Sequence, residues 1–89
     1  MKFEYDPNKS EKNKAKHGID FEEAQDLWND EDLLVFPLLY EAEPRKACIG
    51  RLQGKHWTAI ITCRGENVRI ISVRRSRKDE VEAYENDEI

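Results

Sequence analysis

The sequence has few cysteines, few glycines and no long apolar run. Its two cysteines are too few for a disulfide scaffold, so we expect a reduced, cytoplasmic protein. No stretch approaches the roughly 18 apolar residues that a membrane-spanning helix needs, and the N-terminal residues lack the apolar segment of a secretory signal. The four glycines match neither a P-loop nor a dinucleotide-binding fingerprint. The sequence therefore argues against a membrane protein and against these two classes of nucleotide-binding protein.

Motifs for metal binding and nucleophilic catalysis are also missing. The two histidines, His17 and His56, lie far apart and have no metal-ligand spacing to cysteine or aspartate. Cys48 and Cys63 do not form a Cys-x-x-Cys motif, and both are expected to be small buried hydrophobic residues. No segment resembles the nucleophile elbow of hydrolases. We therefore expect neither a metal ion nor a cofactor.

What the sequence does contain is an unusual amount of segregated charge. Hydrophobic and charged residues each make up 38% of the 89 residues, which predicts one small domain over 1–89 with a thin core. The net charge is +2 over residues 1–19, −9 over 20–43, +9 over 44–78 and −6 over 79–89. The strongly basic block indicates a phosphate-bearing or acidic partner on one face. The alternative is a set of solvated arginines that pair with the acidic helices.

A first helix is predicted over residues 7–17. Asp6 can accept a hydrogen bond from the first backbone N–H groups, and Pro7 suits the first helical position. Gly18 suits the left-handed conformation that ends many helices, so His17 is expected to be the last helical residue. Nearly every side chain of this helix is polar, and it should therefore form an exposed basic surface.

Two further helices are predicted, over residues 20–30 and after Ser76. Asp20 and Glu23 form a capping-box pattern, and an apolar helical stripe follows them. Ser76 has the acidic Asp79 three residues later, as a helix start often does. The residues expected to face inward from these two helices are Phe21, Ala24, Leu27, Trp28, Val81 and Tyr84.

Short apolar or alternating segments between turn residues predict strands at 3–5, 33–36, 45–52, 57–63 and 68–73. Pro37 cannot donate to a strand ladder, so the second strand should lie at an edge. Consecutive hairpins predict a small antiparallel sheet. The helices are segregated from the strands, which predicts an α+β fold with two N-terminal helices and one C-terminal helix against the sheet. The largest buried residues should be Phe21, Leu27, Trp28, Ile60, Ile61, Ile70 and Ile71.

Two turns decide which side chains share a face of this sheet. A tight turn over residues 53–55 is expected to place Cys48 opposite Ile61. At the second turn, a two-residue loop would place Arg64 on the same face as Asn67, Arg69 and Arg75. A longer or shifted turn would instead place it with Ser72 and Arg74. The sequence leaves these two alternatives open.

The most informative chemical feature is a set of arginines around the last hairpin, at positions 64, 69, 74, 75 and 77. A guanidinium group presents a planar fork of donors that matches phosphate, and a strand holds it rigidly. His17, at the end of the basic helix, is a candidate proton donor or acceptor because histidine changes charge near neutral pH. The alternative is that His17 only interacts with the helix dipole.

Two motifs in the sequence resemble the BrnT family. The resemblance covers nearly the whole chain and is carried by residues 6–9, Asn13, 16–24, 49–51, 62–65, 69–74 and Tyr84. It implies a ribonuclease toxin of a type II toxin–antitoxin pair with a RelE-like fold. It also implies a BrnA-like antitoxin with a ribbon-helix-helix part, through which alone the pair contacts DNA. The sequence departs from the family pattern at 55–57 and at 73–76, which leaves room for an altered activity.

The resemblance and the basic pattern together predict a metal-independent endoribonuclease that inhibits growth. The expected catalytic group is His17, Arg64 and Arg74, gathered where the first helix ends beside the last strands. The residues expected to hold the RNA backbone are Lys16, Arg51, Arg69, Arg75 and Arg77. Two other functions remain open: a non-catalytic nucleic-acid-binding module and a protein-interaction domain, each using the basic block 44–78.

Overall fold

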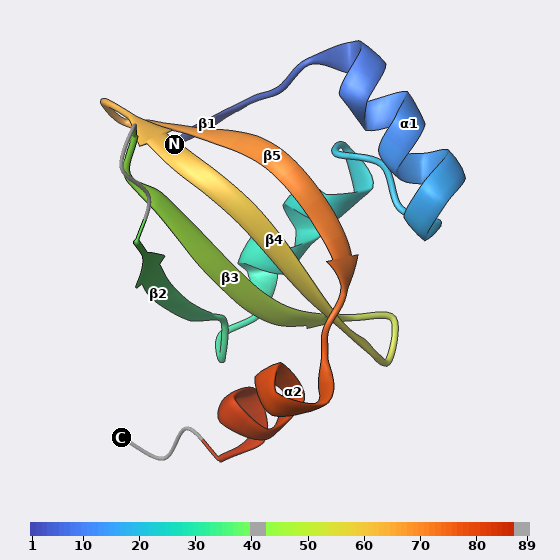
Figure 1. The fold of residues 1–89 in the computed structure, drawn as a ribbon, viewed down its shortest axis with the longest axis vertical. Coiled ribbons are helices and arrows are strands. Elements are labelled where there is room, and N and C mark those ends of the chain that lie inside the picture. Colours follow the sequence, from blue (N-terminus) through green and yellow to red (C-terminus); the bar gives the residue numbers. More distant parts are fainter. Residues whose placement is uncertain (40–42, 87–89) are drawn as a thin grey trace.

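A computed structural model describes residues 1–39 and 43–86 of the chain. The acidic residues at positions 41, 87 and 88 therefore lie outside the described part. Among the described residues, no helix has the length and apolar character needed to cross a membrane. The elements, in chain order, are β1 (Lys2–Glu4), α1 (Pro7–His17), the 3₁₀ helix η1 (Glu23–Asn29), β2 (Leu34–Leu38), β3 (Arg45–Leu52), β4 (Lys55–Arg64), β5 (Asn67–Arg75) and α2 (Lys78–Glu85) (Figure 1).

The strands form one five-stranded sheet in the order β1-β5-β4-β3-β2. The α+β fold is confirmed, but the expectation of a purely antiparallel sheet is wrong, because β1 pairs with β5 in parallel. Parallel strands cannot be joined by a tight turn, so this pairing depends on contacts distant in sequence. One of these contacts is a hydrogen bond of 2.7 Å from Asn67 Nδ2 to Glu4 Oε2. The edge position predicted for β2 from Pro37 is confirmed.

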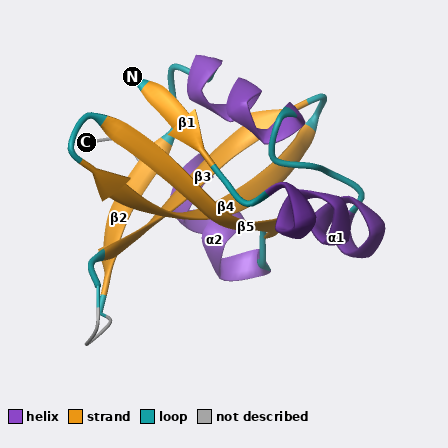
Figure 2. Ribbon diagram, turned by 90° about the horizontal axis from the view of Figure 1, so that it is seen from above, coloured by secondary structure: helices purple, strands orange, loops and turns teal. Residues whose placement is uncertain are grey.

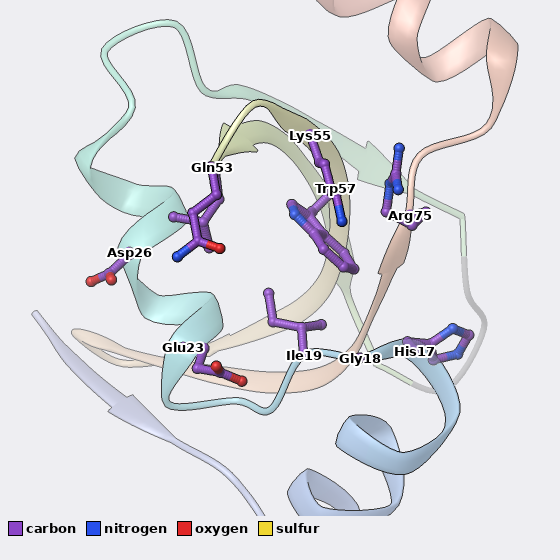
Figure 3. A pocket seen from close by; sticks show the side chains of 10 residues that line it. His17, Gly18, Ile19, Glu23, Asp26, Gln53, Lys55, Trp57 and Arg75 are labelled. Carbon is purple, nitrogen blue, oxygen red and sulfur yellow. The ribbon is translucent and has the colours of Figure 1, made fainter.

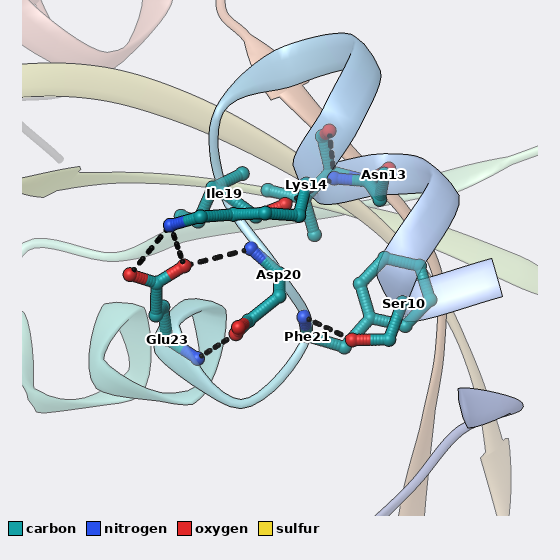
Figure 4. A network of polar contacts seen from close by, with 8 residues as sticks. Ser10, Asn13, Lys14, Ile19, Asp20, Phe21 and Glu23 are labelled. Atoms are coloured by element: carbon teal, nitrogen blue, oxygen red, sulfur yellow. Dashed lines mark hydrogen bonds and ion pairs between the residues drawn. The ribbon is translucent and has the colours of Figure 1, made fainter. Parts of the chain in front are cut away.

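The helix α1 begins and ends as the sequence predicts. The backbone N–H of Asn8 donates to Asp6 Oδ1 over 2.9 Å, and Gly18 has a φ of 83° at the C-terminal cap. Its inward-facing residues are polar, since Ser10 and Asn13 are buried. Figure 4 shows that these side chains bind the backbone of neighbouring segments, so α1 docks through hydrogen bonds while its lysines stay exposed.

The second predicted helix has the expected position but a different type. Asp20 and Glu23 form the reciprocal capping-box hydrogen bonds, of 2.9 Å and 2.7 Å. The following residues form a 3₁₀ helix in place of the predicted α-helix. In a 3₁₀ helix, side chains three residues apart lie directly above one another. Ala24 and Leu27 have this spacing, and both are fully buried against the sheet.

The β3–β4 turn is shifted by one residue from the predicted turn. Leu52 pairs with Lys55, so the loop is Gln53–Gly54, with positive φ at both positions. A turn shifted by one residue changes the partner of every β3 residue by two positions along β4. Cys48 therefore lies opposite Ala59 rather than Ile61. Burial raises the pKa of the Cys48 thiol to about 12.

Cys63 corrects a second expectation about the cysteines. Its side chain is exposed near the end of β4, whereas the sequence predicted that it would be buried. It lies opposite Val68, close to the β4–β5 turn at the end of the strand.

A β-bulge in β5 settles the distribution of the arginines. Ile60 pairs with Ser72 and Ile61 with Ile70, so Ile71 has no partner in β4. The β4–β5 loop is the two-residue Gly65–Glu66 turn, but the bulge reverses the alternation after it. One face of the sheet therefore carries Arg64, Asn67, Arg69, Ser72 and Arg74, while Arg75 lies on the other. Neither sequence-based alternative is right in full.

The two faces of the sheet are covered unequally, as Figure 2 shows. On the first face, here the η1 face, η1 and the segment before it bury Phe21, Leu27, Ile61 and Ile70, as predicted. On the second, the open face, α2 covers only the end that carries Thr58. Three residues predicted to lie in the core are only half-buried: Trp28, Ile60 and Ile71. Ile60 lies on the open face, and Ile71 lies at the bulge.

Ile70→Ala is expected to destabilise the protein by about 2–5 kcal/mol, because Ile70 is 2% exposed in the core of the η1 face. Urea unfolding followed by circular dichroism measures the loss. Ile71→Ala is the matched control, since the neighbouring half-buried isoleucine should lose clearly less. A loss below about 0.5 kcal/mol for Ile70→Ala would contradict the packing described here.

Candidate functional site

One concave site lies where the end of α1 meets the β3–β4 turn and the end of β5. It is a pocket of about 260 Å³, here called the Trp57 pocket. Figure 3 shows side chains from all three parts of the chain around one opening. Its walls are formed by His17, Gly18, Ile19, Glu23, Asp26, Leu52, Gln53, Lys55, Trp57 and Arg75.

The rim of the Trp57 pocket carries basic groups. Arg75 and Lys55 are exposed, and His17 is half-buried beside them. The Arg75 guanidinium lies 5.6 Å from the centre of the Trp57 ring, a cation–π contact that restrains it over the indole. Three side chains able to contact a phosphate group or move a proton thus surround one pocket.

The acidic group on the opposite wall is already neutralised. Lys14 Nζ donates to both carboxylate oxygens of Glu23, over 2.7 Å and 3.0 Å. The Lys14 ammonium and the backbone N–H of Asp20 lower the pKa of Glu23 below its usual value. Glu23 is therefore a paired carboxylate at neutral pH, and Asp26 is the second, exposed acidic residue of the lining.

A line of lysines on α1 leads to this pocket. Lys9, Lys12 and Lys16 are three and four residues apart, which places them on one helical face. They line a second hollow of about 220 Å³ together with Ser72 of β5, and His17 borders both hollows. These exposed lysines, here the lysine strip, form a basic path to the Trp57 pocket.

The predicted catalytic group does not come together as expected. Arg64 lies opposite Asn67 at the β4–β5 turn, whereas Arg74 lies opposite Thr58. The two arginines are roughly 20 Å apart along the strands. His17 lies beside Arg75 on the η1 face, and Arg74 lies on the open face. The expectation that His17, Arg64 and Arg74 gather at one edge is therefore wrong.

Arg74 instead holds α2 against the sheet. Its Nη1 and Nη2 donate to the two oxygens of Glu80 over 2.7 Å and 2.9 Å. Glu80 also accepts hydrogen bonds from Thr58 Oγ1, at 3.1 Å, and from the backbone N–H of Arg77, at 2.8 Å. Mainly because of Arg74, the pKa of Glu80 falls to about 2. Arg74 therefore pairs with an acidic helix, which was the alternative to a phosphate-binding role for the basic block.

The residues predicted to hold RNA are divided among several surfaces. Lys16 belongs to the lysine strip and Arg75 to the Trp57 pocket. Arg69 lies on the open face, 3.9 Å from a carboxylate oxygen of Glu4. Arg51 lines a separate hollow beside Tyr84, and Arg77 is exposed at the start of α2.

Sequence reasoning missed Gln53, Lys55 and Trp57 as site residues. The Gln53–Gly54 turn could have pointed to them. A two-residue hairpin loop places the residues beside it at the end of the sheet, where they can line a pocket. His56 was noticed only as a non-ligand. Its Nε2 lies 2.6 Å from Glu85 Oε2, and its ring packs edge-to-face on Tyr84, so it helps to anchor α2.

Comparison with known protein families identifies the family of this chain. The family described as "Ribonuclease toxin, BrnT, of type II toxin-antitoxin system" matches residues 5–80. No curated protein matches the chain. The matched span contains α1, the whole β2–β5 sheet, the lysine strip and every residue that lines the Trp57 pocket. The chain therefore belongs to the BrnT family of ribonuclease toxins of type II toxin–antitoxin systems.

Proposed function

We propose that this protein is a metal-independent endoribonuclease that cleaves cytoplasmic RNA and so arrests growth, with its active centre in the Trp57 pocket. The observation that carries the proposal is the convergence of His17, Lys55 and Arg75 on one pocket that the lysine strip leads to. Family membership supplies the ribonuclease class. Of the residues predicted from sequence as catalytic, the proposal keeps His17 and replaces the two dispersed arginines with Arg75.

In the proposed reaction, the RNA 2′-hydroxyl attacks the neighbouring phosphate and the 5′-oxygen leaves. His17 accepts the proton of the attacking 2′-hydroxyl, and solvent water protonates the departing 5′-oxygen. Arg75 and Lys55 stabilise the charge that develops on the phosphate oxygens. Arg75 suits this role because its planar fork can contact two oxygens at once and Trp57 restrains its position. Arg64 and Arg69, on the open face, remain candidates for contacts with the RNA backbone.

The proposed partner is an antitoxin, as expected for a type II system. We infer a BrnA-like antitoxin with a ribbon-helix-helix part, which would bring the pair to DNA. Its toxin-binding segment should be acidic, because the described surfaces around the lysine strip and the open face are rich in lysine and arginine. The proposal includes the RelE-like character that the sequence resemblance implies.

Purified protein is expected to cleave a generic RNA in the presence of EDTA. His17→Ala should lower the rate at saturating RNA by at least about 100-fold. Arg75→Lys keeps the charge but loses the fork, and should lower the rate at least about tenfold. A gel assay of single-turnover cleavage measures these rates.

Lys46→Ala is the matched control, since Lys46 is an exposed cation of β3 outside the pocket. It should keep the rate at saturation. Cleavage that requires added Mg²⁺ would contradict metal independence. RNA binding without any cleavage would support the alternative of a non-catalytic nucleic-acid-binding module, and a lack of RNA binding would support the interaction domain.

Induction of this chain alone in a bacterium is expected to stop growth, because an active toxin cleaves RNA faster than the cell replaces it. Co-expression of the neighbouring antitoxin gene should restore growth. Colony counts and optical density after induction measure both effects, and the His17→Ala variant is the control for expression burden. Normal growth at high soluble expression of the wild-type chain would count against the toxin assignment.

A further inference from the structure

The Trp57 pocket contains a buried hydrogen-bond donor without an acceptor. Trp57 is 7% exposed, and no described residue accepts a hydrogen bond from its Nε1–H. Most buried polar groups are paired, because an unpaired donor loses its hydration without compensation. In Figure 3 the indole stands at the centre of the pocket with its nitrogen on the side of Gln53. The nitrogen itself has almost no exposed surface, so an acceptor atom of a ligand would reach it once a neighbouring side chain of the pocket wall, such as the exposed Gln53, moves aside.

The groups around that nitrogen favour a flat ligand with acceptor atoms. Ile19, Leu52 and the indole itself provide apolar wall surface. At the same opening, Lys55 Nζ is only a donor, and the Gln53 amide can donate as well as accept. A free phosphate fits poorly beside apolar walls, since it would lose hydration to reach the indole. A nucleobase brings both a flat apolar face and acceptors on its edge.

We propose that the Trp57 pocket is a nucleobase-recognition site that prefers bases with a carbonyl edge, uracil and guanine. This inference rests on the proposed function, because it takes RNA as the substrate and places the base next to the reacting phosphate. Trp57 Nε1–H donates to the uracil O4 or guanine O6 atom, and the Gln53 amide donates to a second acceptor on the same base.

The same pocket selects against adenine and cytosine. The corresponding edge of each of these bases carries an amino group, at N6 or N4, which is itself a donor. An amino group facing Trp57 Nε1–H opposes one donor to another and leaves this nitrogen unpaired. Sites built to pair with a polar group discriminate strongly in this way. The Gln53 amide can rotate to present either its oxygen or its NH₂ group, so it can adapt to more than one base.

Binding of the four nucleoside 3′-monophosphates tests the proposal without requiring cleavage. The indole N–H signals of ¹⁵N-labelled protein are followed by NMR, and Trp57→Phe assigns the signal of Trp57. Uridylate and guanylate should shift the Trp57 signal, whereas adenylate, cytidylate and inorganic phosphate should leave it nearly unchanged. Trp57→Phe, which keeps an aromatic ring, should weaken uridylate and guanylate binding about 3- to 10-fold.

Trp28→Phe is the matched control, because Trp28 packs edge-to-face on Phe3 away from this pocket. It should leave all four affinities unchanged. An equal response to all four nucleotides, a response to phosphate as large as that to uridylate, or no response to any would overturn the proposal.

Cut sites on a mixed-sequence RNA separate this inference from the proposed function. Wild-type cleavage should favour phosphates next to uracil and guanine, and Trp57→Phe should reduce that preference about 3- to 10-fold. Cleavage that ignores the neighbouring base and is unaltered by Trp57→Phe contradicts only the recognition site. Selective nucleotide binding without RNA cleavage contradicts only the endoribonuclease proposal.

Discussion

Replacing Asn13 with leucine is expected to destabilise the protein by about 3–5 kcal/mol. Asn13 Nδ2 donates to the carbonyl oxygens of Ile19, at 2.8 Å, and Val73, at 2.9 Å. The N–H of Val73 in turn donates to Asn13 Oδ1 over 3.2 Å. Leucine has a similar size but pairs with none of these backbone groups, and each unpaired buried group costs about 1–3 kcal/mol. Urea unfolding at pH 7 measures the change.

The expected effect is large because Asn13 takes the place of a strand. β1 pairs with β5 only as far as Arg69, so beyond that residue β5 forms an open edge. The Asn13 amide accepts from and donates to Val73 as a neighbouring strand would, and in this way α1 covers the edge. A small domain has only about 5–15 kcal/mol of stability in total.

Two further observations check this interpretation. Asn8→Leu changes an exposed asparagine of the same helix and should cost little. Hydrogen exchange at the Val73 N–H should accelerate in Asn13→Leu far more than exchange in the middle of β4. A loss below about 1 kcal/mol in Asn13→Leu would mean that packing, not this side chain, holds α1 against the sheet.

Glu80→Gln is expected to lower the stability at pH 7 by up to about 3 kcal/mol. The Glu80 side chain is 13% exposed, and its carboxylate receives both donors of Arg74. Glutamine keeps the shape but loses the charge, which leaves the Arg74 guanidinium without its partner. Thermal and urea unfolding measure the loss, which should also appear as loosening of α2.

The pH dependence of this contribution has a definite sign. The pKa of Glu80 is about 2 in the folded protein, below the ordinary value of 4.5. A carboxylate with a lowered pKa stabilises the fold above its unfolded value, and the contribution disappears as the pH falls through the folded value. The difference between wild type and Glu80→Gln should therefore be complete above pH 4.5 and shrink as the pH falls toward 2.

Glu82→Gln provides the control on the same helix, because the Glu82 side chain is exposed. It should change stability by less than about 0.5 kcal/mol at any pH. A Glu80→Gln deficit that stays constant down to pH 2 would show that the charge of Glu80 is not what anchors α2.

The limits of α1 could be predicted from sequence because short-range interactions determine them, whereas α2 is capped by Arg77 with Glu80, one residue beyond the predicted Ser76 and Asp79. Asp6, Pro7 and Gly18 set the limits of α1 through their own backbone preferences and side-chain hydrogen bonds. The capping pair Asp20–Glu23 acts within four residues and was also found. Where a turn needed single-residue accuracy, as at Gln53–Gly54, sequence reasoning missed by one position and misplaced the partner of Cys48.

The candidate site could be predicted only in part. His17 and Arg75 were both singled out from their residue types, and they do line one pocket. Their grouping was missed because the bulge at Ile71 determines which face each arginine occupies. Nothing local in the sequence marks that bulge, because its position is defined only by how β5 pairs with β4 in the folded sheet.

By itself, the amino-acid sequence determined the α+β class, the limits of most elements, the basic surface of α1 and the resemblance to BrnT toxins. Only the tertiary structure decided the parallel pairing of β1, the docking of α1 through Asn13 and the commitment of Arg74 to Glu80. It also decided that Trp57 opens a pocket beside His17. Caps, turns and periodicity act between near neighbours in the chain, whereas most of these features join distant residues, 65 positions apart in the pairing of Lys2 with Asn67, and only the folded packing selects among such contacts.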